Sequence, residues 1–340
     1  MRTQDAGARV VGARAVAARW CATFGGAALV VGAGCTLARR IDVVPGIARD
    51  TWAMVTSFVD FALLAYGVAL VALLASVLLS RGGPVRLAAI GLTVALTVLH
   101  GSWLLPDVVA DRDPVAGPER VTVLSQNLLF GAADPSSLRS AAGGADVVVL
   151  VEITRSAADG LVASGFEEDF PYASGGPLPE GGPSGTRIYS RYPLTAGERL
   201  DPAGGAQNWL TTVTVPGLGP ISVAAVHPRR PRLGGQDWWP AQLQVLEHVP
   251  TTRTVVAGDF NAVDSHPSLR QYAARGFRDA DDLVGAGWRP TFPAEGALPP
   301  LIAIDHLLVS ADLTVTDFSR VRVSRTDHLG VLAAVGLRAG

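Results

Sequence analysis

The chain has 340 residues, of which 49% are hydrophobic and 17% are charged, and its formal net charge is −2. Its mean hydropathy is positive, which excludes an ordinary water-soluble protein. From Glu119 onward, 18 arginines stand against 23 acidic residues, a formal charge of −5, so a general nucleic-acid coat protein is also excluded.

The apolar excess lies in the first third of the chain, where residues 20–38, 61–80 and 87–105 contain no charged side chain. A helix of about 20 residues crosses a bilayer. A buried helical core, or a signal peptide for the first segment, is the alternative. Because short arginine-bearing connectors separate the three stretches, we predict three transmembrane helices within residues 1–110. A polar, proline-containing linker follows over 111–118.

The arginines indicate an orientation, since the chain has no lysine. They cluster before the first span and recur between the second and third, and both places face the cytoplasm if three helices span. The C-terminal domain would then be extracytoplasmic, in a multi-pass protein of the cell membrane. Arg39, Arg40 and Arg49 in the first connector oppose this orientation. If the first segment does not insert, the domain lies in the cytoplasm.

Both cysteines, Cys21 and Cys35, fall in the first span. Fourteen helical residues separate them by about 21 Å, which is beyond disulfide reach. The domain that begins near Glu119 has no cysteine, so it has neither a thiolate nucleophile nor a cysteine-ligated zinc site.

From Glu119 onward, strand-like runs alternate with helix-like ones, and helices are expected over 135–142, 155–164, 238–248 and 267–275. The stretches 173–185 and 283–300 read as long loops. Several apolar runs end directly in a polar side chain. The most informative is 255–262, a buried strand that enters Gly-Asp-Phe-Asn-Ala; other runs end at Asn127, Glu152, His227, Asp305-His306 and Asp327-His328. Such strand ends deliver reactive groups to the mouth of a pocket.

These motifs, together with Ser-Gly-Thr-x-x-Tyr-Ser-Arg at 184–191, resemble in their order the endonuclease/exonuclease/phosphatase (DNase I-like) superfamily. The resemblance covers roughly residues 119–338, and the whole chain resembles membrane-anchored actinobacterial members. It implies an α/β fold for 119–340: a four-layered sandwich of two packed mixed β-sheets flanked by helices, preceded by the transmembrane helices.

The chemistry of phosphate-ester hydrolysis explains why these residue types occur together. The reaction needs a divalent cation on the phosphoryl oxygens, an activated water and donors for the developing negative charge. Mg²⁺, with Mn²⁺ as the alternative, takes oxygen ligands. The resemblance implies Glu152 as its main ligand, with Asn127 beside it and Asp327 assisting. A turn-forming role for Asn127 and a solvated one for Glu152 are the alternatives.

The remaining catalytic roles follow the same resemblance. Asp259 takes a proton from the attacking water, and Asn261 orients that water or donates to the phosphate. His328 donates to the scissile phosphate, while Asp305 fixes its tautomer. His227 is a second phosphate donor. The alternatives are an Asx-turn at 259–261 that only caps a helix and a buried structural role for His227.

Arginines 229, 230 and 232 follow His227 closely, and they are candidates to clamp substrate phosphates, with a solvated basic loop as the alternative. Tyr189 is a further substrate-binding candidate from its motif. His266 and His306 are expected to be structural, because neighbouring residues on a strand point to opposite faces. The sequence departs from the family at Val151, where Gln is usual, and at Arg187, where small residues are common.

The sequence thus predicts a membrane-anchored, divalent-metal-dependent hydrolase of a phosphodiester (nucleic acid or phospholipid head group) or a phosphomonoester. The alternative is a non-catalytic protein that binds phosphate or lipid on the same fold. Nucleic acid enters only as a substrate, and no obligate protein partner is evident. The sequence leaves the substrate and the oligomeric state open, because substrate choice lies in loops that vary freely.

Overall fold

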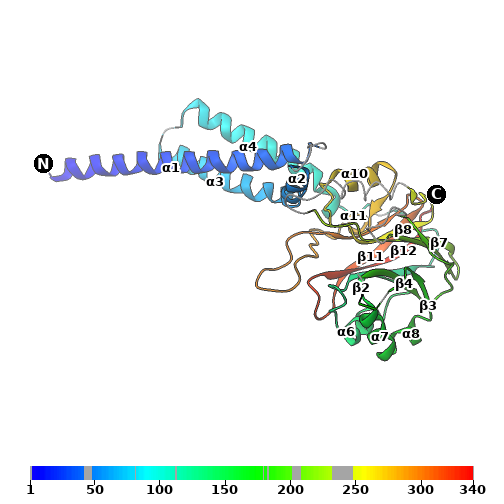
Figure 1. Ribbon diagram of the computed structural model, residues 1–340. Helices are drawn as coiled ribbons and strands as arrows, with labels where there is room; N and C mark the ends of the chain where they lie inside the picture. The colour runs from blue at the N-terminus through cyan, green and yellow to red at the C-terminus, as the bar shows by residue number, and fades with distance from the viewer. Residues whose placement is uncertain are drawn as a thin grey trace. The chain divides into compact units, whose positions relative to one another are not determined.

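The computed structural model describes residues 2–41, 48–80, 82–111, 113–178, 180–181, 184–200, 208–231 and 248–339. The chain forms two compact units. The first comprises Met1–Val44 and Val55–Leu105, and the second comprises Pro45–Met54 and Pro106–Gly340 (Figure 1).

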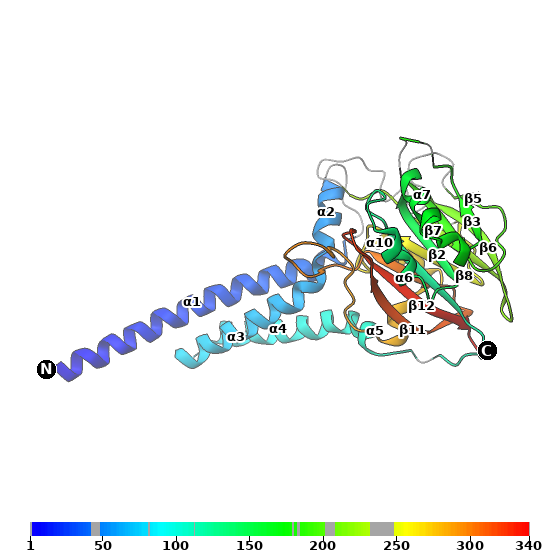
Figure 2. The same cartoon turned by 90° about the horizontal axis from the view of Figure 1, so that it is seen from below.

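The first unit is helical. It contains α1 (Arg2–Ala38), the 3-10 helix η1 (Val59–Phe61), α3 (Ala62–Leu79) and α4 (Pro84–Trp103), and α2 (Ala48–Thr56) extends into both units. The helices α1, α3 and α4 lie side by side in both views (Figure 2). Among the described residues, three stretches are long and apolar enough to cross a membrane, Gly12–Ala38, Val59–Leu79 and Pro84–Trp103. These stretches overlap the three predicted spans, and they suggest that the protein associates with a membrane.

Close helix contacts in this unit depend on small and polar residues. A Cβ on Gly32 would lie 2.5 Å from the ring of Tyr66, so only glycine lets α1 approach α3 there. The Thr36 hydroxyl is 2.6 Å from the Tyr66 hydroxyl and 3.0 Å from His100 Nδ1. Large apolar side chains such as Trp20 and Leu78 are exposed on the outer faces, as expected for helices that meet lipid.

The short helix α5 (Leu105–Val108) follows the first unit in the chain, and the second unit contains two six-stranded sheets. The first sheet has the order β11 (Leu313–Arg322), β12 (Leu329–Leu337), β1 (Val121–Asn127), β2 (Val147–Ile153), β4 (Gly185–Ser190), β3 (Tyr172–Gly175). The second has the order β5 (Glu198–Arg199), β6 (Trp209–Val215), β7 (Gly219–Val226), β8 (Thr254–Asp259), β10 (Asp305–Val309), β9 (Arg278–Asp279). Both are mixed, since β1–β2 and β7–β8 are parallel pairs and the other described pairs are antiparallel.

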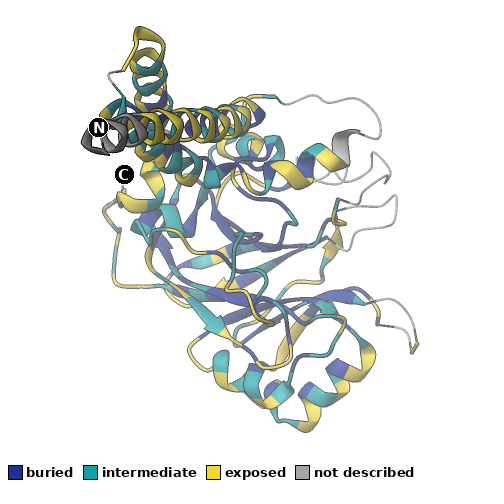
Figure 3. Cartoon of the chain, turned by 90° about the vertical axis from the view of Figure 1, so that its left-hand side faces the viewer, coloured by how far each residue is buried: buried dark blue, intermediate teal, exposed yellow. Residues whose placement is uncertain are grey.

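Apolar side chains from both sheets form a core between them, including Val123, Val149, Val223 and Val255. Helices α6 (Pro135–Ala141), α7 (Arg155–Ala163) and α8 (Phe166–Asp169) cover the first sheet (Figure 1). Helix α10 (Pro267–Ala274) covers the second sheet, and α11 (Ala280–Val284) adds Ala280 and Leu283 to the core between the sheets. Buried residues are concentrated in the strands (Figure 3). The predicted four-layered sandwich is therefore confirmed.

The local sequence signals explain most element boundaries. The Asp134 carboxylate accepts from Ser137 N at 2.7 Å and caps α6, and Pro267 opens α10. The helix expected over 238–248 lies almost wholly outside the described residues. The loop expected over 173–185 is shorter than predicted, because β3 occupies Tyr172–Gly175 as an edge strand.

Candidate active site

The topology brings the polar strand ends together. Strands β1 and β2 are parallel, and so are β7 and β8, so the carboxyl ends within each pair lie at one edge of its sheet. Strand β10 runs antiparallel to β8, and its first residue, Asp305, is registered opposite the last residue of β8, Asp259. Residues that are 46 positions apart in the sequence therefore become direct neighbours.

Asp259 lies at the centre of the site and is only 2% exposed. Its Oδ2 accepts from Asn127 Nδ2 at 3.0 Å, and its Oδ1 accepts from the Asn261 backbone at 2.8 Å. The Nε2 atoms of His227 and His328 lie 3.8 and 3.9 Å from Oδ2. Burial raises the pKa of Asp259, and Asp305 raises it further against the opposing effect of His328. A carboxylate of raised pKa is a better proton acceptor than an ordinary aspartate.

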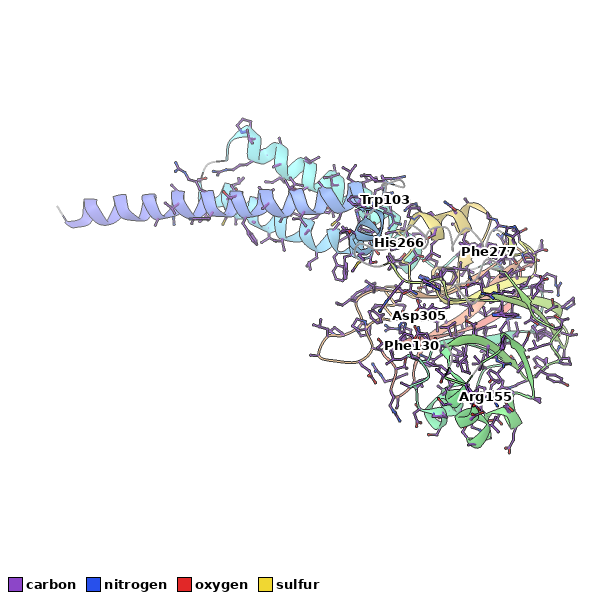
Figure 4. The ribbon with its side chains drawn as sticks, viewed as in Figure 1. Trp103, Phe130, Arg155, His266, Phe277 and Asp305 are labelled. Carbon is purple, nitrogen blue, oxygen red and sulfur yellow. The ribbon has the colours of Figure 1, made fainter. Side chains whose placement is uncertain are left out.

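Asp305 and His328 form a buried acid–imidazole pair. Asp305, which is labelled in Figure 4, has its Oδ2 atom 2.8 Å from His328 Nδ1. The ring of Phe292 packs 4.9 Å from the imidazole. Burial lowers the pKa of His328, but the charge and hydrogen bond of Asp305 outweigh it, and with Asp259 and Asp327 they raise that pKa to about 10. This raised pKa favours the protonated imidazole, and its Nε2 is directed toward carboxylates rather than a backbone carbonyl.

Glu152 reaches the site through a β-bulge. The register between β2 and β4 shifts between Val151 and Ile153, and Glu152 has a positive φ of 56°. A bulge re-aims a side chain that would otherwise follow the strand alternation. The Glu152 carboxylate accepts from Phe130 N at 2.8 Å, and its Oε1 lies 3.5 Å from His227 Nε2. Glu152 and Asp259 thus both lie within 4.0 Å of one imidazole nitrogen.

The Gly-Asp-Phe-Asn turn has specific backbone requirements. Gly258 has a φ of 155°, and a Cβ there would lie 1.9 Å from the Val226 carbonyl oxygen, so no other residue fits. Asn261 has a φ of 50° and donates through Nδ2 to the Pro228 carbonyl at 2.9 Å. Its amide therefore fixes the residues that follow His227.

The other predicted site residues differ in their positions. Asp327 Oδ1 lies 3.8 Å from His328 Nε2, at the edge of the cluster. Arg229 and Arg230 are exposed and follow His227 by two and three positions, whereas Arg232 lies outside the described residues.

Tyr189 is not brought to the cluster. It is 2% exposed, and its ring packs edge-on at 5.3 Å from Phe166 in the core beneath the helices. Burial raises the pKa of its phenol to about 12. The structure therefore does not bring this predicted substrate-binding residue to the other site residues, because strand alternation directs its side chain to the covered face of the sheet.

Sequence reasoning missed two residues that link the site together. Gln126 Nε2 donates to the backbone carbonyls of Asn127, at 2.8 Å, and His328, at 3.3 Å. The Thr326 hydroxyl also donates to the Asn127 carbonyl at 2.8 Å. Together they tie the end of β1 to the 326–328 turn. Their only sequence signal is adjacency to the catalytic candidates.

The donor set suits a hard divalent cation. Carboxylate oxygens of Asp259 and Asp305 lie within 4.8 Å of one another, beside the imidazole of His328. Two buried oxygens at this place, Asp305 Oδ1 and Asp327 Oδ1, have no hydrogen-bond partner among the described residues. Buried carboxylate oxygens are costly to leave unpaired, and oxygen-rich sites are those that Mg²⁺ and Mn²⁺ occupy.

A second carboxylate–imidazole group, Asp264, Asp279 and His306, also has closely spaced ligand atoms. Both ring nitrogens of His306 already have hydrogen-bond partners there. Its Nδ1 is 2.6 Å from Asp279, and its Nε2 is 2.9 Å from the Ala262 carbonyl. This arrangement is that of a structural histidine in the core of the second sheet.

The fold resembles that of several solved proteins. An endonuclease/exonuclease/phosphatase from Beutenbergia cavernae is 23% identical, with a TM-score of 0.50 over 65% of this chain and 72% of that chain. A D. rerio TDP2 in complex with a single-strand DNA product is 18% identical, with a TM-score of 0.52 over 64% of this chain and all of that chain. A Bacteroides vulgatus endonuclease/exonuclease/phosphatase is 16% identical, with a TM-score of 0.51 over 65% of this chain and all of that chain. At these identities the likeness shows the fold.

The family model of the Endonuclease/Exonuclease/phosphatase family matches residues 124–328, which is more than half of the chain. No curated protein matches the chain significantly. The chain belongs to the endonuclease/exonuclease/phosphatase family, and this membership places it among the hydrolases of phosphate esters.

Proposed function

We propose that the protein is a membrane-anchored phosphoesterase that uses a divalent cation, Mg²⁺ or Mn²⁺, to hydrolyse a phosphodiester or phosphomonoester with water. The observation that carries the proposal is the convergence on Asp259 of side chains from several strand ends. Asn127, His227 and His328 all lie within 4.0 Å of its Oδ2 atom.

Glu152, Asn127 and Asp327 would hold the cation, together with the free oxygen of Asp305. When bound, such an ion withdraws electron density from the phosphoryl oxygens and offsets their charge. Glu152 Oε1 remains 3.5 Å from His227, so this histidine can orient the carboxylate or hydrogen-bond to the substrate. Arg229 and Arg230 supply exposed positive charge two and three residues after His227.

The proton chemistry belongs to Asp259 and His328. Asp259 accepts the proton of the attacking water, since its pKa is raised and Asn127 fixes its carboxylate. His328 donates a hydrogen bond through Nε2 to a phosphoryl oxygen and stabilises the charge that develops there. Asp305 holds the imidazole with Nε2 outward by accepting at Nδ1, as the acid of a catalytic triad does.

For the organisation of the chain, we propose residues 119–340 as the hydrolase domain, 111–118 as a linker and 1–110 as the membrane region of a cell-membrane protein. The arginine distribution supports an extracytoplasmic hydrolase domain. A phosphatase and a fluorescent protein, each fused after Gly340, would test the orientation. Activity of the phosphatase fusion without fluorescence is expected, and the reverse pattern would place the domain in the cytoplasm.

The enzymatic proposal is tested with the full-length protein and bis-p-nitrophenyl phosphate. Turnover should require Mg²⁺ or Mn²⁺, disappear with EDTA and return when the cation is restored. Glu152→Gln should raise the Mg²⁺ concentration needed for half-maximal rate by at least about tenfold. Phosphate-ligand binding without turnover under any divalent cation would instead indicate a binding protein.

A further inference from the structure

The segment that follows Asn127 has an unusual backbone. Leu129, Phe130 and Gly131 have successive positive φ angles of 49°, 50° and 75°. Positive φ is uncommon for residues other than glycine and costs of order 1 kcal/mol or more for each. Of these three residues, only Gly131 has a steric reason for its identity, because a Cβ there would lie 2.2 Å from the Thr154 hydroxyl.

Groups of the candidate site hold this conformation. Asn127 Oδ1 accepts from Leu129 N at 2.8 Å, and the Glu152 carboxylate accepts from Phe130 N at 2.8 Å. The backbone of Phe130 is thus one hydrogen bond away from the main predicted cation ligand. The conformation also explains where the side chain goes. The flanking Leu128 and Ala133 are buried, whereas Phe130 is 65% exposed.

Neither packing nor the backbone hydrogen bond accounts for an aromatic residue at this position. Any residue supplies the N–H group that Glu152 accepts, and glycine or asparagine would do so with less strain. An exposed phenyl ring also adds no core stability. The N–H of Phe130 donates to the Glu152 carboxylate, whose Oε1 lies 3.5 Å from His227 Nε2. The backbone of Phe130 is therefore anchored to the predicted cation ligand, and its exposed side chain starts from that point.

Resting on the proposed function, we propose that Phe130 is a specificity-determining residue that contacts an apolar chain next to the reacting phosphate. The substrate class is then a lipid-type phosphate ester. Two observations favour a lipid chain over a nucleobase. The domain from Glu119 onward has a formal charge of −5, which opposes a polyanionic strand. The same chain also carries three helices apolar enough to reach a membrane, where lipid phosphates are concentrated.

The test uses full-length protein in lipid nanodiscs and p-nitrophenyl diesters that share one leaving group. The second ester group is methyl, butyl, hexyl or 5′-thymidyl, so only the part that would meet Phe130 varies. Phe130→Ala keeps a Cβ and hence the same backbone cost, and Phe130→Tyr keeps the ring as a matched control. Calorimetric binding of methylphosphonate and hexylphosphonate gives a second measurement that does not depend on turnover.

For the wild type, kcat/KM should rise about twofold for each added methylene, since a fully buried methylene is worth about fourfold. Phe130→Ala should lower the hexyl value about tenfold and leave the methyl value within twofold, and Phe130→Tyr should behave as wild type. Hexylphosphonate binding should weaken in parallel.

An equal fall for methyl and hexyl esters, or a loss confined to the thymidyl ester, would overturn the inference. Absence of wild-type turnover of every ester would instead refute the proposed function. In that case, phosphonate binding still decides whether Phe130 contacts the chain.

Discussion

Two aspartate–histidine pairs in this protein differ in what remains available for chemistry. Asp305 and His306 are consecutive residues at the start of β10, so their side chains leave opposite faces of the strand. Asp305 pairs with His328 at 2.8 Å, and His306 pairs with Asp279 at 2.6 Å. The distinction lies at the second ring nitrogen. His306 Nε2 is bound to the Ala262 carbonyl, whereas His328 Nε2 faces Asp259 and Asp327 at 3.9 and 3.8 Å.

An acid–imidazole pair is therefore not by itself evidence for a catalytic site. Both imidazoles are at least nine-tenths buried, and a neighbouring aspartate raises the pKa of each. The Asp305 pair differs because it stands at the strand ends with a second carboxylate and an unpaired carboxylate oxygen beside it. We therefore expect substitutions in the Asp305–His328 pair to change turnover and substitutions in the Asp279–His306 pair to change stability.

The largest effect is expected at Asp259, which is the carboxylate that distinguishes the two pairs. Asp259→Asn removes the proton acceptor and should lower kcat for a phosphodiester by about 10⁴-fold, the upper end of the range for general-base catalysis. Steady-state kinetics with saturating Mg²⁺ would measure the loss. Thermal unfolding should show an intact fold, and turnover within tenfold of wild type would remove Asp259 from the proposed chemistry.

A smaller loss of activity is expected when Asp305, the carboxylate that orients His328, is changed. Asp305→Asn removes the charge that raises the pKa of His328, so that pKa should fall from about 10 toward or below the ordinary range of histidine. The rate should fall by about 10²- to 10³-fold, the range for weakening one donor to a developing negative charge. Imidazole NMR titration would detect the pKa change. An unchanged His328 titration would show that Asp305 does not control this histidine.

The matched substitution in the Asp279–His306 pair should affect only the stability of the fold. Asp279→Asn leaves a buried imidazole without its counter-charge and should lower the free energy of unfolding by about 3 kcal/mol. Chemical denaturation would measure this value. The kcat per folded molecule should stay within about twofold of wild type, and a loss comparable with that of Asp305→Asn would end the distinction between the pairs.

The pH dependence of stability provides the smallest of these effects. Burial lowers the pKa of His306, but the charge and hydrogen bond of Asp279 outweigh it and raise that pKa well above the ordinary value. A raised folded-state pKa contributes stability that is fully present below the unfolded value, near 6.5, and is lost as pH rises through the folded value. Above pH 6.5, this pair should contribute a decline of up to about 1.4 kcal/mol per pH unit. The decline should be absent from Asp279→Asn, and identical pH profiles for both proteins would contradict the assignment.

Apolar runs that end in polar residues marked the strand ends in the sequence, and the two-sheet fold was then implied by the family resemblance that these motifs carry. The sequence also predicted the opposite roles of Asp305 and His306, since strand alternation alone separates them. Alternation did not place Tyr189 in advance, because both faces of its strand are buried: Ile188 packs between the sheets and Tyr189 packs beneath the helices. Three features depend on contacts between distant segments, so no local sequence pattern predicts them. They are the β-bulge at Glu152, the hydrogen bonds from Gln126 to the 326–328 turn and the strained turn at 129–131.

Hydrolysis of bis-p-nitrophenyl phosphate in ¹⁸O-labelled water tests most directly whether a water activated at Asp259 attacks the phosphorus. Attack on phosphorus by a water activated at Asp259 predicts one ¹⁸O atom in the released p-nitrophenyl phosphate, unlabelled nitrophenol and only background product with Asp259→Asn. Label in the nitrophenol, or equal labelled product from the variant, would contradict this account.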